Sequence, residues 1–184
     1  MLYHVSGTAG IKILEPRVSS HGKAYVYAIN NLVTALLFGA RHDDFDFLLT
    51  EEDGRPVVYE CYPGAFEKIY AGKSCSVYEI AEDGFLSGVT SWEPEFVCEE
   101  AIEVLRETFV PDLYGHLQEE EKQGNLVLNR YEDTMEYKKL ISEHIVDRMI
   151  RFDAVPCLET DERFKRYYKK IGEALLELMD GHLL

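Results

Sequence analysis

One stretch constrains the fold of this chain more than any other: a short aromatic strand that runs directly into a helix. Residues 24–28 read Ala-Tyr-Val-Tyr-Ala, which alternates with period two and is rich in strand-forming side chains. After it, apolar residues recur at helical spacing, and Asn30 or Asn31 is placed to cap the helix N-terminus. The sequence therefore predicts a strand over 24–28 and a helix over about 30–39.

Further short strands surround this unit, and longer helices follow it. We expect strands at 2–6, 45–50, 57–62, 75–80, 85–89 and 92–97, with a short helix at 65–70 and a hairpin turn at Asp83-Gly84. Apolar stripes predict helices at 111–122, 132–151 and 161–180. The predicted fold class is α+β, with a mainly antiparallel sheet over residues 1–108 and a helical extension over 109–184 packed on it.

The charge balance limits the partners that this chain can have. Its 184 residues suit one domain, or one domain with a helical extension, and carry 19 basic against 34 acidic side chains, a net charge of −15. Such a surface repels phosphate backbones and anionic lipid, so we expect neither a nucleic-acid nor a membrane partner. A small anionic ligand is still compatible, because a few local donors can hold one.

The cysteines and the N-terminus indicate a cytoplasmic protein. Four cysteines lie far apart, at positions 61, 75, 98 and 157, and form no C-x-x-C pair. Reduced thiols are typical of the cytoplasm. We see neither the basic and apolar pattern of a signal peptide nor the roughly 18 consecutive apolar residues of a membrane span.

One loop has the composition of a metal site but not its spacing. His42, Asp43, Asp44 and Asp46 lie close together in the sequence. They match no calcium or zinc pattern, because the glycine and the distal glutamate of a calcium loop are missing. We interpret this segment as a solvated loop and expect no metal.

Three of the predicted strands resemble the core of a known family. Leu-Tyr-His-Val-Ser at 2–6 carries His4, Gly-Lys-Ala-Tyr-Val-Tyr-Ala at 22–28 precedes a helix with Thr34-Ala35, and Glu-Phe-Val begins at Glu95. This order is similar to the ADP-ribosyltransferase fold, in the poly(ADP-ribose) polymerase-like branch with a His-Tyr-Glu triad. The resemblance covers about the first 105 residues and implies a split, mainly antiparallel sheet.

The resemblance implies NAD as a substrate and assigns roles to particular residues. Glu95 is expected to stabilise the oxocarbenium-like transition state when the bond between nicotinamide and ribose breaks. His4 is expected to hydrogen-bond the adenosine-side ribose, and Tyr27 or Tyr25 to stack on the nicotinamide ring. The residues expected to complete the binding of the cofactor are Val5 through its backbone, Thr34 through its hydroxyl, and Phe38. A protein acceptor for the ADP-ribosyl group is a further expected partner.

Two positions of the motif favour an alternative to an NAD-cleaving enzyme. The position of the family's stacking tyrosine is Val26 here, between Tyr25 and Tyr27, and the glycine that usually follows the histidine is Val5. In a strand, an offset of one residue turns a side chain to the opposite face. The alternative is therefore an inactive scaffold of the same type that holds a nucleotide or a protein.

Two other functions remain open at this stage. A transferase that removes 2′-phosphate from tRNA is a further branch of the family, but it should present basic residues to an RNA phosphate, and a net charge of −15 makes that a poor fit. A structural protein whose helices over 132–180 form an oligomer seam is the other. Each candidate residue also has an ordinary role, since His4, for example, can simply hydrogen-bond backbone in a strand.

Overall fold

The computed structural model describes residues 1–18, 22–42, 46–90 and 92–151. The chain forms two compact units that alternate along the sequence. Of the described residues, those within 1–41, 53–56 and 70–126 form the first unit, and those within 42–52, 57–69 and 127–151 form the second. These units are defined by contacts between residues, whereas the predicted boundary near residue 108 follows a change in composition. The predicted division has one boundary, and the two units alternate along the chain.

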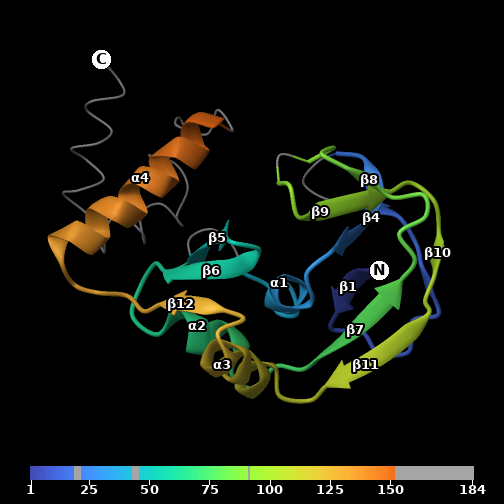
Figure 1. The fold of residues 1–184 in the computed structure, drawn as a ribbon, viewed down its shortest axis with the longest axis horizontal. Helices are drawn as coiled ribbons and strands as arrows, with labels where there is room; N and C mark the ends of the chain where they lie inside the picture. Colours follow the sequence, from blue (N-terminus) through green and yellow to red (C-terminus); the bar gives the residue numbers. More distant parts are fainter. Residues whose placement is uncertain (19–21, 43–45, 91, 152–184) are drawn as a thin grey trace. The chain divides into compact units, whose positions relative to one another are not determined.

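The first unit is built on an antiparallel sheet (Figure 1). Within the described residues it has seven strands, in the order β11-β7-β1-β4-β9-β8, with β3 paired to β4. The strands are β1 (Leu2–Ser6), β3 (Arg17–Val18), β4 (Ala24–Ile29), β7 (Cys75–Ile80), β8 (Leu86–Ser87), β9 (Glu95–Cys98) and β11 (Arg106–Val110). A separate pair joins β2 (Ile13–Leu14) to β10 (Ile102–Glu103). The strands predicted to carry His4, Tyr27 and Glu95 are therefore neighbours, in the order β1-β4-β9.

The sheet opens between β1 and β4. Five residues of β1 pair with β7, but among the described residues only Tyr3 and Ile29 pair β1 with β4. On its other side, β4 pairs regularly with β9 from Val26 to Ile29. We call the place where β1 and β4 stop pairing the split. It exposes the edges of two strands inside the sheet, where backbone groups need partners other than a neighbouring strand.

The helix after β4 covers one face of the sheet next to the split. Helix α1 (Leu32–Leu37) packs on β1 and β4, and Asn31 caps it by accepting a hydrogen bond of 3.0 Å from the Thr34 N–H. Its last carbonyl, at Leu37, accepts a hydrogen bond of 2.7 Å from the buried Tyr70 hydroxyl. Helix α3 (Leu113–Gln123) lies against α1. The opposite face of the sheet carries a buried apolar core of Leu2, Leu14, Val26, Ala28, Tyr78, Ile80 and Cys98.

Among its described residues, the second unit contains a smaller sheet and two helices. Strands β5 (Phe47–Glu52), β6 (Arg55–Glu60) and β12 (Val127–Asn129) lie in the order β12-β6-β5, and β12 runs parallel to β6. The helices are α2 (Ala65–Tyr70) and α4 (Met135–Arg151). Asp53 and Gly54, both at positive φ, turn the chain between β5 and β6.

The element types agree with the prediction in most places. The fold is mixed α and β with mainly antiparallel sheets, and Asn31 rather than Asn30 caps α1. The predicted hairpin at Asp83-Gly84 is wrong, because β7 pairs with β1 and β11 while β8 pairs with β9. The helix predicted at 161–180 lies outside the described residues. No helix within the described ranges is long and apolar enough to cross a membrane.

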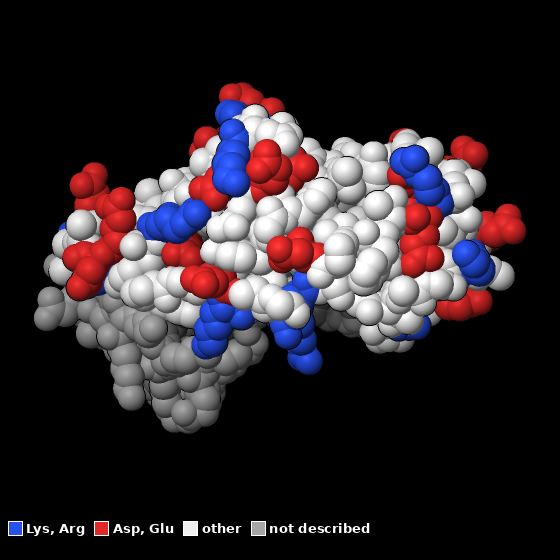
Figure 2. Space-filling view, turned by 90° about the horizontal axis from the view of Figure 1, so that it is seen from below, with Lys and Arg blue, Asp and Glu red and all other residues white. Residues whose placement is uncertain are grey.

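The loop expected to be solvated is partly buried. Asp46 is 9% exposed and accepts a hydrogen bond of 2.7 Å from the Tyr62 hydroxyl, and the His42 ring lies 4.3 Å from that of Phe47. Positions 43–45 lie outside the described residues. On the face displayed in Figure 2, acidic and basic side chains of the described residues are interspersed.

Candidate functional site

The strand register divides the predicted triad between the two faces of the sheet. Side chains alternate along a strand, and directly paired residues share a face. Because Ile29 pairs with both Tyr3 and Glu95, the face covered by α1 carries Glu95 and Tyr27. His4 pairs with Tyr78 and lies on the opposite face, with the buried core.

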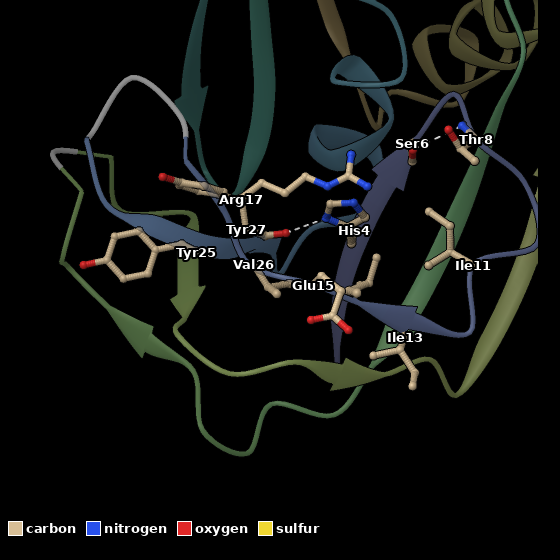
Figure 3. Close-up of a pocket in the computed structure, with 11 residues that line it drawn as sticks. His4, Ser6, Thr8, Ile11, Ile13, Glu15, Arg17, Tyr25, Val26 and Tyr27 are labelled. Carbon is tan, nitrogen blue, oxygen red and sulfur yellow. Dashed lines mark hydrogen bonds between the residues drawn. The ribbon is translucent and has the colours of Figure 1, made fainter.

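The His4 hollow lies on the core side of the split (Figure 3). It has a volume of about 280 Å³ and is lined by His4, Ser6, Thr8, Ile11, Ile13, Leu14, Glu15, Arg17, Tyr25, Val26 and Tyr27. These residues come from β1, the segment after it, β3 and β4. The volume is close to the lower end of ligand pockets, which is roughly 300 Å³. A ring or a sugar with one charged group is therefore a suitable occupant.

His4 bridges the split through its own ring. Its Nδ1 atom lies 2.7 Å from the backbone carbonyl oxygen of Tyr27. A carbonyl oxygen can only accept, so Nδ1 carries the proton and donates it. Partial burial lowers the pKa of His4, the bond to Tyr27 opposes this effect, and the positive charge of Arg17 lowers the pKa further. The ring is therefore neutral at pH 7 and presents Nε2 as a hydrogen-bond acceptor.

Arg17 supplies a positive charge in the same hollow. Its guanidinium extends from β3 toward the imidazole of His4, whereas the ring of Tyr25 points away from it (Figure 3). Within the described part of the chain, the side chain of Arg17 makes no ion pair or hydrogen bond. In a chain of net charge −15, this cation is available to an anion.

The Glu95 hollow lies on the α1 side of the split. It has a volume of about 90 Å³ and is lined by Tyr3, Val5, Tyr27, Ala28, Ile29, Ala35, Phe38 and Glu95. Four of the predicted site residues meet here: Val5, Tyr27, Phe38 and Glu95. The Phe38 ring also packs against Trp92, with the ring centroids 5.6 Å apart. Tyr27 lines both hollows, so it is the residue that the two share.

Two expectations about the ligand-facing side chains are not matched by the geometry. Thr34 is 1% exposed and lines neither hollow, and its hydroxyl has no hydrogen-bond partner among the described residues. The regular pairing of β4 with β9 leaves Val26, at the family's tyrosine position, in the buried core. The Tyr27 side chain accordingly faces α1. The pairing of β4 with β9 is continuous from Val26 to Ile29, so no bulge turns Tyr27 to the other face.

Sequence reasoning did not identify Arg17 or Trp92. Arg17 lies on a two-residue strand just before a polar segment, which gives no periodic signal. Trp92 precedes β9 and was interpreted only as part of a strand. Three or more metal-ligating side chains do not cluster anywhere in the described ranges.

Comparison with known proteins gives no family. The chain matches no family model, no curated protein and no solved structure. The functional interpretation therefore rests on the residues and their geometry.

Proposed function

We propose that this chain is a protein of ADP-ribosyltransferase type that binds NAD at the split and cleaves the bond between nicotinamide and ribose. It acts either as an ADP-ribosyltransferase with a protein acceptor or as an NAD glycohydrolase. The observation that supports the proposal is the position of the split. It separates the two strands that carry His4 and Tyr27, and β9, which carries Glu95, lies next to them.

The His4 hollow suits the adenosine-side ribose of NAD with the phosphate attached to it. The unprotonated Nε2 of His4 accepts a hydrogen bond from a ribose hydroxyl, because its Nδ1 proton is engaged by Tyr27. Arg17 neutralises the phosphate, for which a guanidinium with its planar set of donors is well suited. Ile11 and Ile13 contribute apolar surface to the same hollow.

The Glu95 hollow suits the nicotinamide ribose. As the nicotinamide leaves, positive charge develops on the ribose, and the Glu95 carboxylate stabilises it. Water or an acceptor nucleophile then forms the new bond to the same carbon. Phe38 and Tyr27 offer aromatic surface beside the carboxylate, and the Val5 backbone lies at the edge of the same hollow.

A second function is favoured by one specific observation. His4 and Glu95 lie on opposite faces of the sheet, and the hollow beside Glu95 measures only about 90 Å³. This arrangement favours a module that holds a nucleotide such as ADP-ribose in the His4 hollow without cleaving NAD. The valines at positions 5 and 26 of the motif agree with it.

Nicotinamide release from NAD decides between the two functions. The purified protein is compared with Glu95→Gln and with Glu93→Gln, which removes an exposed carboxylate two residues away. Release by the wild type and Glu93→Gln, with at least a hundredfold loss in Glu95→Gln, supports cleavage. Equal release from all three proteins contradicts the role of Glu95.

Calorimetric titration with ADP-ribose tests the binding module. Binding by a folded protein that releases no nicotinamide, with a loss of affinity in Arg17→Gln, supports the second function. A cooperative thermal transition of each variant controls for folding. Absence of both binding and release contradicts both functions.

A further inference from the structure

A hydrogen-bond network around Glu107 and Tyr78 holds one wall of the His4 hollow, and no part of the proposed function uses it. The wall is the segment over residues 7–11, which follows β1 and contributes Thr8 and Ile11 to the lining of the hollow. It contains two glycines, and Gly10 has a φ of 80°. A segment of this kind needs fixed partners if it is to keep one shape.

Glu107 on β11 is the first partner. Its Oε1 atom accepts a hydrogen bond of 2.8 Å from the Gly10 N–H and one of 2.7 Å from the Ser76 hydroxyl. These two donors lower the pKa of Glu107, and the positive charge of Lys12 acts in the same direction. The carboxylate therefore stays ionised near neutral pH, and a charged acceptor forms the stronger kind of hydrogen bond.

Tyr78 on β7 is the second partner. Its hydroxyl donates a hydrogen bond of 2.6 Å to the Thr8 carbonyl and accepts one of 3.3 Å from the Ile11 N–H. It also lies 3.2 Å from Oε1 of Glu107. Since a hydroxyl has one proton, the shorter contact to Thr8 takes it. The Tyr78 ring is fully buried, so its hydroxyl is a fixed point of attachment.

We propose that Glu107 and Tyr78 are positioning residues, which hold the segment over residues 7–11 as the wall of the His4 hollow. This inference rests on the proposed function for the nature of the ligand. It adds that the affinity for the ribose and phosphate of a nucleotide depends on a carboxylate that never touches them. The rate of bond cleavage, in contrast, does not depend on this carboxylate.

Amide hydrogen exchange of the free protein tests the attachment without any ligand. Glu107→Ala, which removes the acceptor of the Gly10 N–H, is expected to raise the exchange rate at Gly10, and Tyr78→Phe at Ile11, each by about tenfold. Glu119→Ala, which removes a carboxylate paired with Lys122 on α3, is the matched control and leaves both rates unchanged. Unchanged rates in both test variants overturn the proposal.

Titration with ADP-ribose then tests the consequence for the hollow. Glu107→Ala is expected to weaken binding by about tenfold and, where the wild type releases nicotinamide, to raise KM while leaving kcat unchanged. Faster exchange with wild-type affinity overturns the link to the hollow. A wild type that neither binds ADP-ribose nor releases nicotinamide overturns the proposed function and the ligand-holding role together. In that case the exchange rates still show whether Glu107 and Tyr78 hold the segment over residues 7–11.

Discussion

The Nδ1 atom of His4 donates a 2.7 Å hydrogen bond to the Tyr27 carbonyl across the split. The bond replaces the backbone pairing that β1 and β4 do not make there, so the ring is part of the sheet as well as of the hollow. The same bond fixes the tautomer and leaves Nε2 as the acceptor for a ligand. One side chain therefore couples the fold at the split to the chemistry of the site.

This coupling predicts a pH dependence of stability. The pKa of His4 in the fold lies below its ordinary value of 6.5, first because of burial and also because of Arg17. The unfolded chain therefore binds the proton more readily, and the contribution of His4 to stability falls as the pH decreases below 6.5. Urea unfolding at pH 8 and pH 5.5 is expected to show a smaller difference in His4→Gln than in the wild type.

The control for this measurement is Thr108→Ala, which changes an exposed side chain on β11 that carries no ionisable group. It is expected to keep the wild-type difference between the two pH values. If His4→Gln keeps that difference as well, the proton on His4 is not linked to folding.

Thr34→Val tests whether the Thr34 hydroxyl is a buried group without a partner or a group that binds the nucleotide. The side chain is 1% exposed and its hydroxyl has no partner among the described residues, a state that costs free energy. Thr34→Val is therefore expected to raise the free energy of unfolding by about 1 kcal/mol and to leave ADP-ribose binding unchanged. Chemical denaturation and calorimetric titration measure the two quantities.

The control is Ser142→Ala, since the buried Ser142 hydroxyl donates to the Lys138 carbonyl at 2.6 Å. Its loss is expected to cost about 1 kcal/mol, the opposite sign. Weaker nucleotide binding in Thr34→Val would restore the role that the family resemblance assigns to this hydroxyl.

The sequence predicted most elements because their signals are local. Alternation in 24–28 and the cap at Asn31 are read from a few adjacent residues, and both agree with the structure. The edge strand β11 was not predicted. Its first four residues are exposed or half-buried, and its pairing with β7 is non-local.

The geometry of the candidate site depends on pairing that no local pattern encodes. The sequence predicts that His4, Tyr27 and Glu95 lie on three strands. It does not predict the register, which divides these residues between the two faces of the sheet. Nor does it show that β1 leaves β4 after one pair, which creates the split and brings Arg17 beside His4. Charged residues such as Arg17 and Glu107 carry no periodic signal, so only their contacts reveal them.

The buried carboxylate of Glu60 gives a prediction about the second unit. Its Oε1 accepts a hydrogen bond of 2.8 Å from the Phe66 N–H in the first turn of α2, and its Oε2 one of 3.1 Å from the Tyr131 N–H. Glu60→Ala leaves both donors without this acceptor and is expected to cost about 3 kcal/mol of unfolding free energy. Glu60→Gln keeps one acceptor and is expected to cost less.

The exposed Glu51→Ala on β5 is the matched control, with an expected change within about 0.5 kcal/mol. Urea unfolding measures all three variants. A loss in Glu60→Ala no larger than that of the control would show that water replaces the carboxylate at both donors.

The glycine that ends α1 gives a prediction about packing. A Cβ on Gly39 would lie 2.8 Å from Cδ2 of Leu113, 2.9 Å from Sγ of Cys75 and 3.0 Å from the Leu36 carbonyl oxygen. Because Leu113 lies on α3 and its Cδ2 atom would be closer than a Cβ tolerates, Gly39→Ala forces α1 away from α3 and is expected to cost about 2 kcal/mol. Gly7→Ala is the control, since no atom lies within 4 Å of its Cβ position. Urea unfolding that shows equal losses in the two variants would mean that α1 and α3 are packed less closely than the structure indicates.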